Sequence, residues 1–113
     1  MDEVQQIYDN LAQELHRGTL VISVLLVLKK EEYGYSIVKN LQKKKIDIEQ
    51  NTLYPLLRRL EKQRLLQSNW DVSETRPRKY YKISTIGEKV LKKLLEKWQG
   101  LNNAIDTIIK EVK

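Results

Sequence analysis

The stretch Asn51-Thr-Leu-Tyr-Pro-Leu-Leu-Arg-Arg-Leu-Glu61 decides the fold, together with Arg76-Pro-Arg-Lys-Tyr-Tyr-Lys82 further along the chain. The leucines of the first stretch recur at three- and four-residue steps, the spacing of one helix face. They are Leu53, Leu56, Leu57 and Leu60. The opposite face is polar and cationic and carries Asn51, Thr52, Tyr54, Arg58, Arg59 and Lys62. Such a helix, followed by a basic loop, is typical of a protein that enters a DNA groove and grips the backbone.

The net charge of +6 is concentrated around these two stretches. Residues 1–33 hold three cationic and six acidic side chains, residues 34–82 hold twelve and five, and residues 83–113 hold six and four. A positive middle segment is what a surface that meets phosphates requires. The alternative interpretation of the same charge is a solvated, lysine-rich surface.

The composition excludes several other classes of protein. The chain of 113 residues contains no cysteine, which excludes disulfides and thiolate metal sites. His16 is the only histidine and no glycine-rich phosphate-binding loop is present, so we expect no catalytic residue, no metal and no cofactor. The start of the chain shows no leader pattern, and the apolar run Leu20–Leu28 is too short to span a bilayer. We therefore expect a cytoplasmic protein with no membrane partner.

Apolar spacing predicts three helices before the Asn51 stretch. The first covers residues 2–15, and Gly18 is expected to break or bend the chain after it. The second is a buried helix over Leu20–Leu28, closed by a charged turn, and the third covers residues 35–45. The segment 46–49 alternates apolar and polar side chains, which favours an extended connection.

Two runs with strand-like alternation follow, over residues 65–72 and 78–84, joined by the polar turn 73–77. Helices followed by a hairpin predict a mainly α, winged helix-turn-helix fold with a two-stranded β-hairpin wing and N- and C-terminal dimerisation helices. We expect one domain over residues 1–113. It comprises a winged helix-turn-helix core at 17–84 and a dimerisation helix at 85–113, with the helix of residues 1–16 packing on that last one.

The last helix carries a regular apolar seam. Thr85 and Glu88 fit a capping box at its start. The seam alternates three- and four-residue steps and consists of Leu91, Leu94, Trp98, Leu101, Ile105, Ile108 and Val112. A narrow seam on a terminal helix requires a second helix, and the simplest source is the same helix of a second copy. The spacing therefore predicts a homodimer.

Three motifs of the chain resemble the PadR family of bacterial transcriptional regulators. They are Tyr33-Gly-Tyr-Ser-Ile37, Thr52-Leu-Tyr-Pro-Leu-Leu-Arg-Arg-Leu-Glu-Lys62, and Arg76-Pro-Arg-Lys-Tyr-Tyr81 with Gly87. The resemblance covers roughly residues 17–100, and the short last helix is similar to that of the compact subgroup. It implies a dimeric winged-helix repressor of a palindromic operator, usually near its own gene or a transporter or detoxification gene.

Two positions depart from the family pattern. Arg64 stands where members commonly have glycine, so the helix is expected to end differently or Arg64 to accept a strained left-handed conformation. The wing turn reads Glu74-Thr-Arg-Pro77 instead of a glycine-bearing turn, which leaves its tip conformation and backbone contacts open.

The resemblance and the helix face together assign the DNA-binding roles. Thr52, Tyr54 and Arg58 are expected to face the groove, with Arg58 donating paired hydrogen bonds to guanine. Asn51 joins this set or is only the helix cap, and Tyr54 has packing against the wing as its alternative role. Arg59 and Lys62 are phosphate contacts or solvated charges. The remaining expected backbone contacts are Tyr35, Lys39, Arg76, Arg78 and Lys79.

Trp98 is the candidate ligand-binding residue. It lies in the seam two residues before Gly100, which suggests space beside a flat ring. Some compact members hold flat hydrophobic compounds between paired tryptophans and release their operator, so the resemblance implies a planar hydrophobic or phenolic inducer. The alternative is an ordinary interface aromatic in a repressor without a ligand pocket. Trp70 is expected to pack in the hairpin. A winged-helix module that binds an acidic protein partner is the alternative function.

Overall fold

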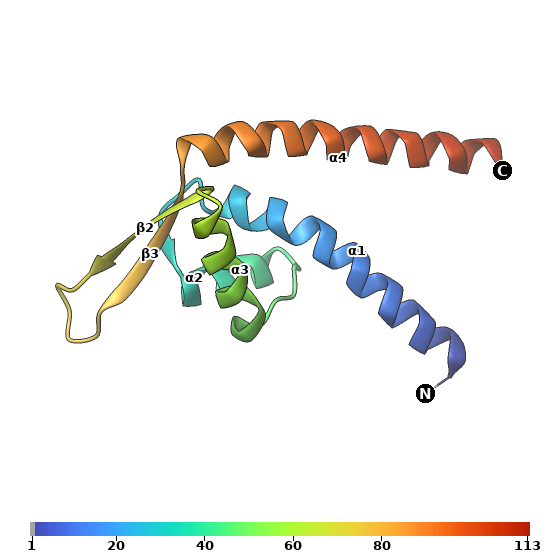
Figure 1. The fold of residues 1–113 in the computed structure, drawn as a ribbon. Coiled ribbons are helices and arrows are strands. Elements are labelled where there is room, and N and C mark those ends of the chain that lie inside the picture. The colour runs from blue at the N-terminus through green and yellow to red at the C-terminus, as the bar shows by residue number, and fades with distance from the viewer. Residues whose placement is uncertain (1) are drawn as a thin grey trace.

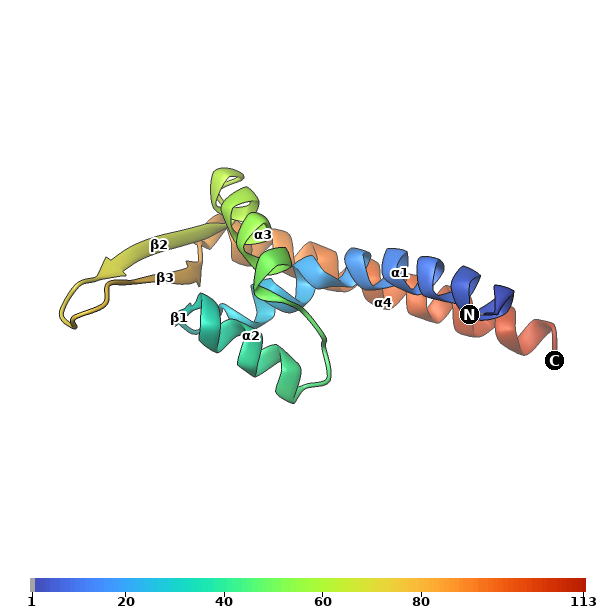
Figure 2. The ribbon, with the colours of Figure 1, turned by 90° about the horizontal axis from the view of Figure 1, so that it is seen from below.

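The computed structural model describes residues 2–113, which form a mainly helical fold with one small antiparallel sheet (Figure 1). The elements in chain order are α1 (Glu3–Val27), β1 (Glu32–Tyr33), α2 (Gly34–Lys43), α3 (Gln50–Lys62), β2 (Leu66–Asp71), β3 (Arg78–Ile83) and α4 (Thr85–Glu111). Three helices are followed by the β2–β3 hairpin, so the predicted winged helix-turn-helix fold is confirmed. The hairpin projects to one side of the core, and α1 and α4 project to the other in both views (Figure 2).

The first two predicted helices are one continuous helix, so the expected break at Gly18 is wrong. The side chain of Asp2 caps α1 by accepting a hydrogen bond of 2.7 Å from the amide of Gln5. A single glycine costs a helix only about 1 kcal/mol relative to alanine. The second half of α1 buries Leu20, Val24 and Leu25 in the core, which outweighs that cost.

The helix pair α2 and α3 forms the helix-turn-helix. Lys45 ends α2 with a positive φ of 64°, and the amide of Ile46 bonds back to the carbonyl of Leu41. Residues 46–49, expected to be extended, have no regular secondary structure and pair with no strand, and Ile48 is buried in the core. The core of the molecule is made by the apolar faces of α1, α2 and α3 with the base of the wing.

The wing strands β2 and β3 lie within about one residue of their predicted bounds. The hairpin is joined by a third strand, β1, which the sequence analysis placed in a charged turn. In the register, Glu32 lies opposite Tyr81 and Tyr33 opposite Tyr80. Tyr81 is buried and Tyr80 is partly exposed, because neighbouring residues of a strand lie on opposite faces of the sheet. The wing is therefore the outer part of a three-stranded sheet with the order β1-β3-β2.

Arg64 has a φ of 68°, so it accepts the left-handed conformation that glycine commonly provides there. The amide of Leu65 bonds to the carbonyl of Leu60 at 2.9 Å, and the amide of Arg64 bonds to that of Glu61. This pair of bonds defines a Schellman end for α3. A side chain in this conformation costs about 1–3 kcal/mol, which the buried surroundings of Leu65 and Leu66 offset.

The cap of α4 is Ser84 and not Thr85, which corrects the predicted capping box. The Ser84 hydroxyl accepts a bond of 2.9 Å from the amide of Gly87 and donates one of 2.7 Å to the carbonyl of Arg64. A Cβ on Gly87 would lie 2.2 Å from the carbonyl oxygen of Leu65. Gly87 therefore lets the first turn of α4 approach the α3–β2 connection closely enough for these bonds.

Candidate nucleic-acid interface

The recognition helix α3 divides into a buried and an exposed face. Leu53, Leu57 and Leu60 are at most 1% exposed, and Leu56 is partly buried. The side chains predicted to meet DNA are all exposed: Asn51, Thr52, Tyr54, Arg58, Arg59 and Lys62. Glu49 occupies the cap position without a side-chain hydrogen bond, and Asn51 lies inside the helix, so the alternative that Asn51 is only the cap is wrong.

Tyr54 packs on the start of α2. A Cβ built on Gly34 would come within 2.5 Å of its ring and hydroxyl, so the ring packs directly on the glycine backbone. The side chain remains 37% exposed. Gly34 thus holds Tyr54 at the junction of α2 and α3, with part of its ring free on the outer face.

Cations and aromatic rings alternate across α2 and the sheet. The guanidinium of Arg78 lies 4.6 Å from the ring centre of Tyr33, which meets the ring of Tyr80 edge-on at 5.4 Å. The ring of Tyr35 stacks near Tyr33, and the Lys39 ammonium lies 5.5 Å from its centre. Cation–π contacts orient these flexible side chains without neutralising them. These contacts bring the side chains of Tyr35, Lys39 and Arg78 together on one side of the recognition helix.

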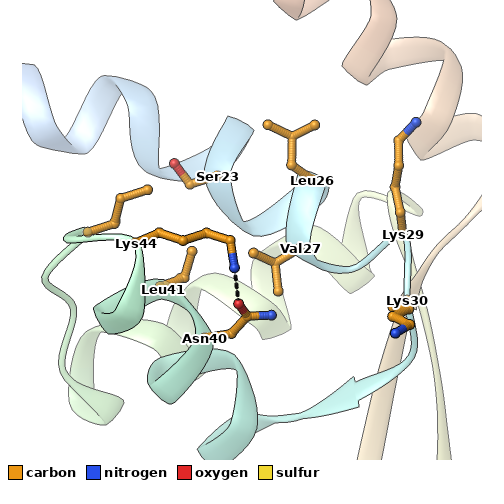
Figure 3. A pocket seen from close by; sticks show the side chains of 9 residues that line it. Ser23, Leu26, Val27, Lys29, Lys30, Asn40, Leu41 and Lys44 are labelled. Atoms are coloured by element: carbon orange, nitrogen blue, oxygen red, sulfur yellow. Dashed lines mark hydrogen bonds between the residues drawn. The ribbon is translucent and has the colours of Figure 1, made fainter.

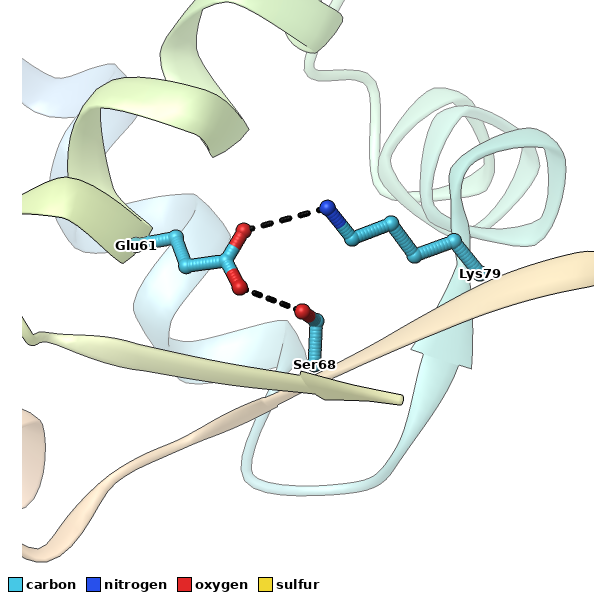
Figure 4. A network of polar contacts seen from close by, with 3 residues as sticks. All are labelled: Glu61, Ser68 and Lys79. Atoms are coloured by element: carbon cyan, nitrogen blue, oxygen red, sulfur yellow. Dashed lines mark hydrogen bonds and ion pairs between the residues drawn. The ribbon is translucent and has the colours of Figure 1, made fainter. Parts of the chain in front are cut away.

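The wing turn places Arg76 in the open and engages Lys79. Residues 71–77 are all exposed, and Arg76 lies at the tip. The Lys79 ammonium instead forms an ion pair of 3.2 Å with the carboxylate of Glu61 on α3 (Figure 4). The Ser68 hydroxyl donates to the other oxygen of the same carboxylate. Two cations of the predicted wing set, Arg76 and Arg78, are therefore free of carboxylate partners among residues 2–113.

The pKa values of this pair reflect their contacts. The hydrogen bond from Ser68 lowers the pKa of Glu61 below its ordinary value, and the bond and charge of Lys79 act in the same direction against partial burial. Desolvation acts to lower the pKa of Lys79, but the hydrogen bond and charge of Glu61, together with the contribution of Tyr81, outweigh it and raise that pKa. Both groups are therefore charged at neutral pH.

The apolar seam of α4 leaves the core after its third turn. Leu91 is buried and Leu94 is packed against the core, but Trp98 is 43% exposed. The remaining predicted seam residues Leu101, Ile105, Ile108 and Val112 are exposed. The first half of α1 is exposed as well, through Val4, Ile7, Tyr8, Leu11 and Leu15. Within one chain the two helices splay apart (Figure 1), so packing of residues 1–16 on an α4 helix would need a second copy.

Trp70 does not pack in the hairpin as predicted. Its side chain is 62% exposed on β2, opposite Lys79 in the register. The prediction failed because the core beneath the sheet ends at Leu66 and Tyr81, below the level of Trp70. The wing therefore presents an indole on the same strand face as Ser68.

A cavity of about 480 Å³ opens between α1 and α2. Figure 3 shows Leu26, Val27 and Leu41 on its walls, with lysines around it. The Lys44 ammonium donates to the Asn40 side chain, whose amide donates to Glu32 at 3.0 Å. The residues that line this cavity include none from α4. It is therefore separate from the predicted ligand site at Trp98.

The sequence analysis gave no role to Glu61 or Gly34. Glu61 had a detectable signal, since it is an acidic residue near the end of a helix where the dipole favours cations, and cations flank it in the sequence. Gly34 had none, because the ring of Tyr54 that covers it comes from another helix. Within residues 2–113, no helix is both long and apolar enough to cross a bilayer.

Comparison with known proteins agrees with this geometry. Residues 24–93 match the Transcriptional regulator PadR-like family. A crystal structure of a PadR family transcriptional regulator from Eggerthella lenta is 43% identical, with a TM-score of 0.88 over 94% of this chain and 95% of that one. A PadR-like transcription factor from Bacteroides fragilis is 34% identical, with a TM-score of 0.75 over 88% and 98% of the two chains.

A curated relative from Lysinibacillus sphaericus, itself uncharacterised, is 35% identical over 82% of this chain and 90% of its own length. The family match covers more than half of the chain, and it includes the recognition helix, the wing and the first turns of α4. Members of this family are regulators of transcription and not enzymes. The chain belongs to the PadR-like family of transcriptional regulators.

Proposed function

We propose that this DNA-binding regulator acts as a homodimeric repressor on a palindromic operator. The observation that carries the proposal is the exposed face of α3, where Thr52, Tyr54 and Arg58 interleave hydrogen-bonding groups with charge. Base edges are read by hydrogen bonds, and phosphates are held by cations. Lys39 on α2 and Arg76 on the wing flank that face and are suited to the backbone on either side.

The dimer follows from the exposed seams. A two-fold dimer through α4 and the first half of α1 buries apolar side chains that one chain leaves in water. Its two α3 helices would enter successive major grooves about 34–36 Å apart. A protein dimer with two-fold symmetry matches an operator with two-fold symmetry, which is a palindrome. A dimer bound at a promoter would block RNA polymerase, and this is why we assign the protein as a repressor.

Arg58→Ala is expected to lower discrimination between the operator and a scrambled duplex by about 1–3 kcal/mol for each half-site, because the paired bonds to guanine are lost. The measurement is a competition titration of the protein's own upstream DNA against the scrambled duplex at one salt concentration. Lys89→Ala, an exposed cation on α4, is the matched control and should leave the ratio unchanged. An unchanged ratio in Arg58→Ala would remove Arg58 from the groove.

The alternative is a winged-helix module that binds an acidic protein. It predicts that Arg58→Ala abolishes capture of that protein while DNA retention is unaltered. Membership of a family of transcriptional regulators favours the operator. The mixture of hydroxyl, phenol and guanidinium groups on α3 favours it too, since an acidic protein surface needs only charge.

We place the inducer site at Trp98. The side chain is 43% exposed in one chain and lies on the seam between the core and the free part of α4. In a two-fold dimer, two such rings would approach each other and accept a flat hydrophobic or phenolic molecule between them. The ligand would bind more tightly to a dimer conformation whose two recognition helices are not separated by one helical turn of DNA. It would thereby shift the population away from the DNA-binding conformation.

A tryptophan fluorescence titration tests this site. In a Trp70→Phe background, Trp98 is the only tryptophan, and ethidium in the absence of DNA is expected to quench it. The Trp98→Phe variant that retains Trp70 is the control and should show little quenching, since Trp70 lies on the wing. No quenching of Trp98 up to the solubility limit of the dye would leave a repressor without this pocket.

A further inference from the structure

The carboxylate of Glu61 connects the recognition helix to both strands of the wing. One oxygen accepts a hydrogen bond from the Ser68 hydroxyl on β2, and the other pairs with the Lys79 ammonium on β3 at 3.2 Å (Figure 4). Each oxygen therefore has its own partner on its own strand. A link of this kind fixes a direction as well as a distance, because both lone-pair sets are used.

These contacts join the hairpin to α3 beyond its buried base. The base of the hairpin is held by the buried side chains of Leu66, Tyr81 and Ile83. Beyond Ser68 and Lys79, residues 69–77 are all exposed. The opposite face of the hairpin is held against β1 by the contacts of Tyr33 with Tyr80 and Arg78. On the face toward α3, the polar link of Glu61 sets how the wing lies against the recognition helix.

The stability of α3 itself does not account for Glu61. The residue lies in the last turn, where the helix dipole disfavours an acidic side chain by about 0.3–1 kcal/mol. Its side chain is 33% exposed and that of Lys79 30%, so the ion pair is partly solvated. Surface pairs of this kind contribute little to folding, typically about 0–1 kcal/mol. A role in positioning the wing explains the placement better than a role in stability.

The pair also changes the charge that the wing offers to DNA. Lys79 extends from β3 on the face that looks toward α3, the same face as Tyr81, whose ring centre is 5.3 Å from its ammonium. Arg76 and Arg78 have no carboxylate partner among the described residues. Of the three predicted wing cations, Lys79 alone is already matched by an opposite charge.

We propose that Glu61 is a positioning residue for DNA binding, which sets the wing against the recognition helix and withholds Lys79 from the phosphates. The inference rests on the proposed operator binding. Glu61 would then set the distance between the recognition helix in the major groove and the wing on the adjacent DNA backbone. Arg76 and Arg78 would be the wing cations that contact phosphates.

The salt dependence of DNA binding tests this role, because each phosphate contact adds about 0.9 to the slope of log K against log salt. The duplexes are the protein's own upstream DNA and a scrambled version of it. Lys79→Met is expected to leave the slope nearly unchanged, whereas the matched variant Arg76→Met should flatten it by about 0.9 per copy.

Glu61→Gln keeps the shape of the side chain but frees Lys79. It should steepen the slope by about 0.9 per copy, so that a dimer loses about tenfold more affinity than the unaltered protein between 50 and 200 mM salt. The double variant Glu61→Gln/Lys79→Met should return to the original slope. Ser68→Ala, which removes a hydrogen bond but no charge, should keep the original slope.

Two results would overturn the inference. If Lys79→Met flattens the slope as much as Arg76→Met, Lys79 is an ordinary phosphate contact. If Glu61→Gln lowers the melting temperature and the affinity with no change in slope, Glu61 serves only the fold. Absence of salt-dependent binding by the unaltered protein would instead refute the proposed operator binding, and the role of Glu61 with it.

Discussion

Raising the salt concentration from 50 to 200 mM is expected to weaken binding to the upstream DNA by about 10³–10⁵-fold. The expected backbone cations, once Lys79 is set aside, are Lys39, Arg59, Lys62, Arg76 and Arg78. Five in each copy make ten in a dimer, and each neutralised phosphate releases condensed counterions. The measurement is fluorescence anisotropy of a labelled duplex at four or more salt concentrations.

The scrambled duplex provides the control, because it keeps the phosphates and loses the base edges. Its affinity should fall with a similar slope from a weaker starting value. Equal affinity for the upstream DNA at low and high salt would exclude docking driven by phosphates. That outcome would favour the module that binds a protein partner.

Ile105→Asp is expected to convert the protein into a monomer and to lower operator affinity by about 10²–10⁴-fold. Ile105 is 54% exposed in one chain and lies in the middle of the free part of the α4 seam. A carboxylate there would be buried without a partner in each copy of a dimer. The loss of affinity reflects the second half-site, which a tethered partner binds at a high effective concentration.

Sedimentation velocity at micromolar protein measures the first effect, and anisotropy measures the second. Thr107→Asp is the matched control, since it adds the same charge on the opposite face of the helix, away from the seam. A single species of 13.4 kDa in the unaltered protein would contradict the dimer. Dimers in both variants would show that the seam is not the interface.

The recognition helix and the hairpin were predictable because their signals are local. The leucine spacing of α3 identified its buried face, and the exposed face carries each polar residue that the same spacing assigned to it. The alternation within β3 implies that one of Tyr80 and Tyr81 packs inward, but the structure was needed to show that it is Tyr81. The PadR-like motifs added the family, which the comparisons confirm.

Contacts between distant segments were not predictable in the same way. The strand β1 is two residues long and exists only because β3 offers it a partner about fifty positions later. The cap moved from Thr85 to Ser84 because the carbonyl of Arg64 accepts a bond from the Ser84 hydroxyl. Gly18 stays helical because Leu20 and Val24, beyond it, are anchored in the core.

The sequence by itself determined which faces of the helices are apolar, where the positive charge lies and which family the chain resembles, since periodicity and composition are properties of neighbouring residues. Only the tertiary structure decided that Lys79 is paired with Glu61 while Arg76 is free, and that Tyr54 rests on Gly34. The physical reason is that an ion pair or a close packing contact depends on where two separate elements are held. The core fixes that position, and it cannot be predicted from the spacing of residues within one helix or strand.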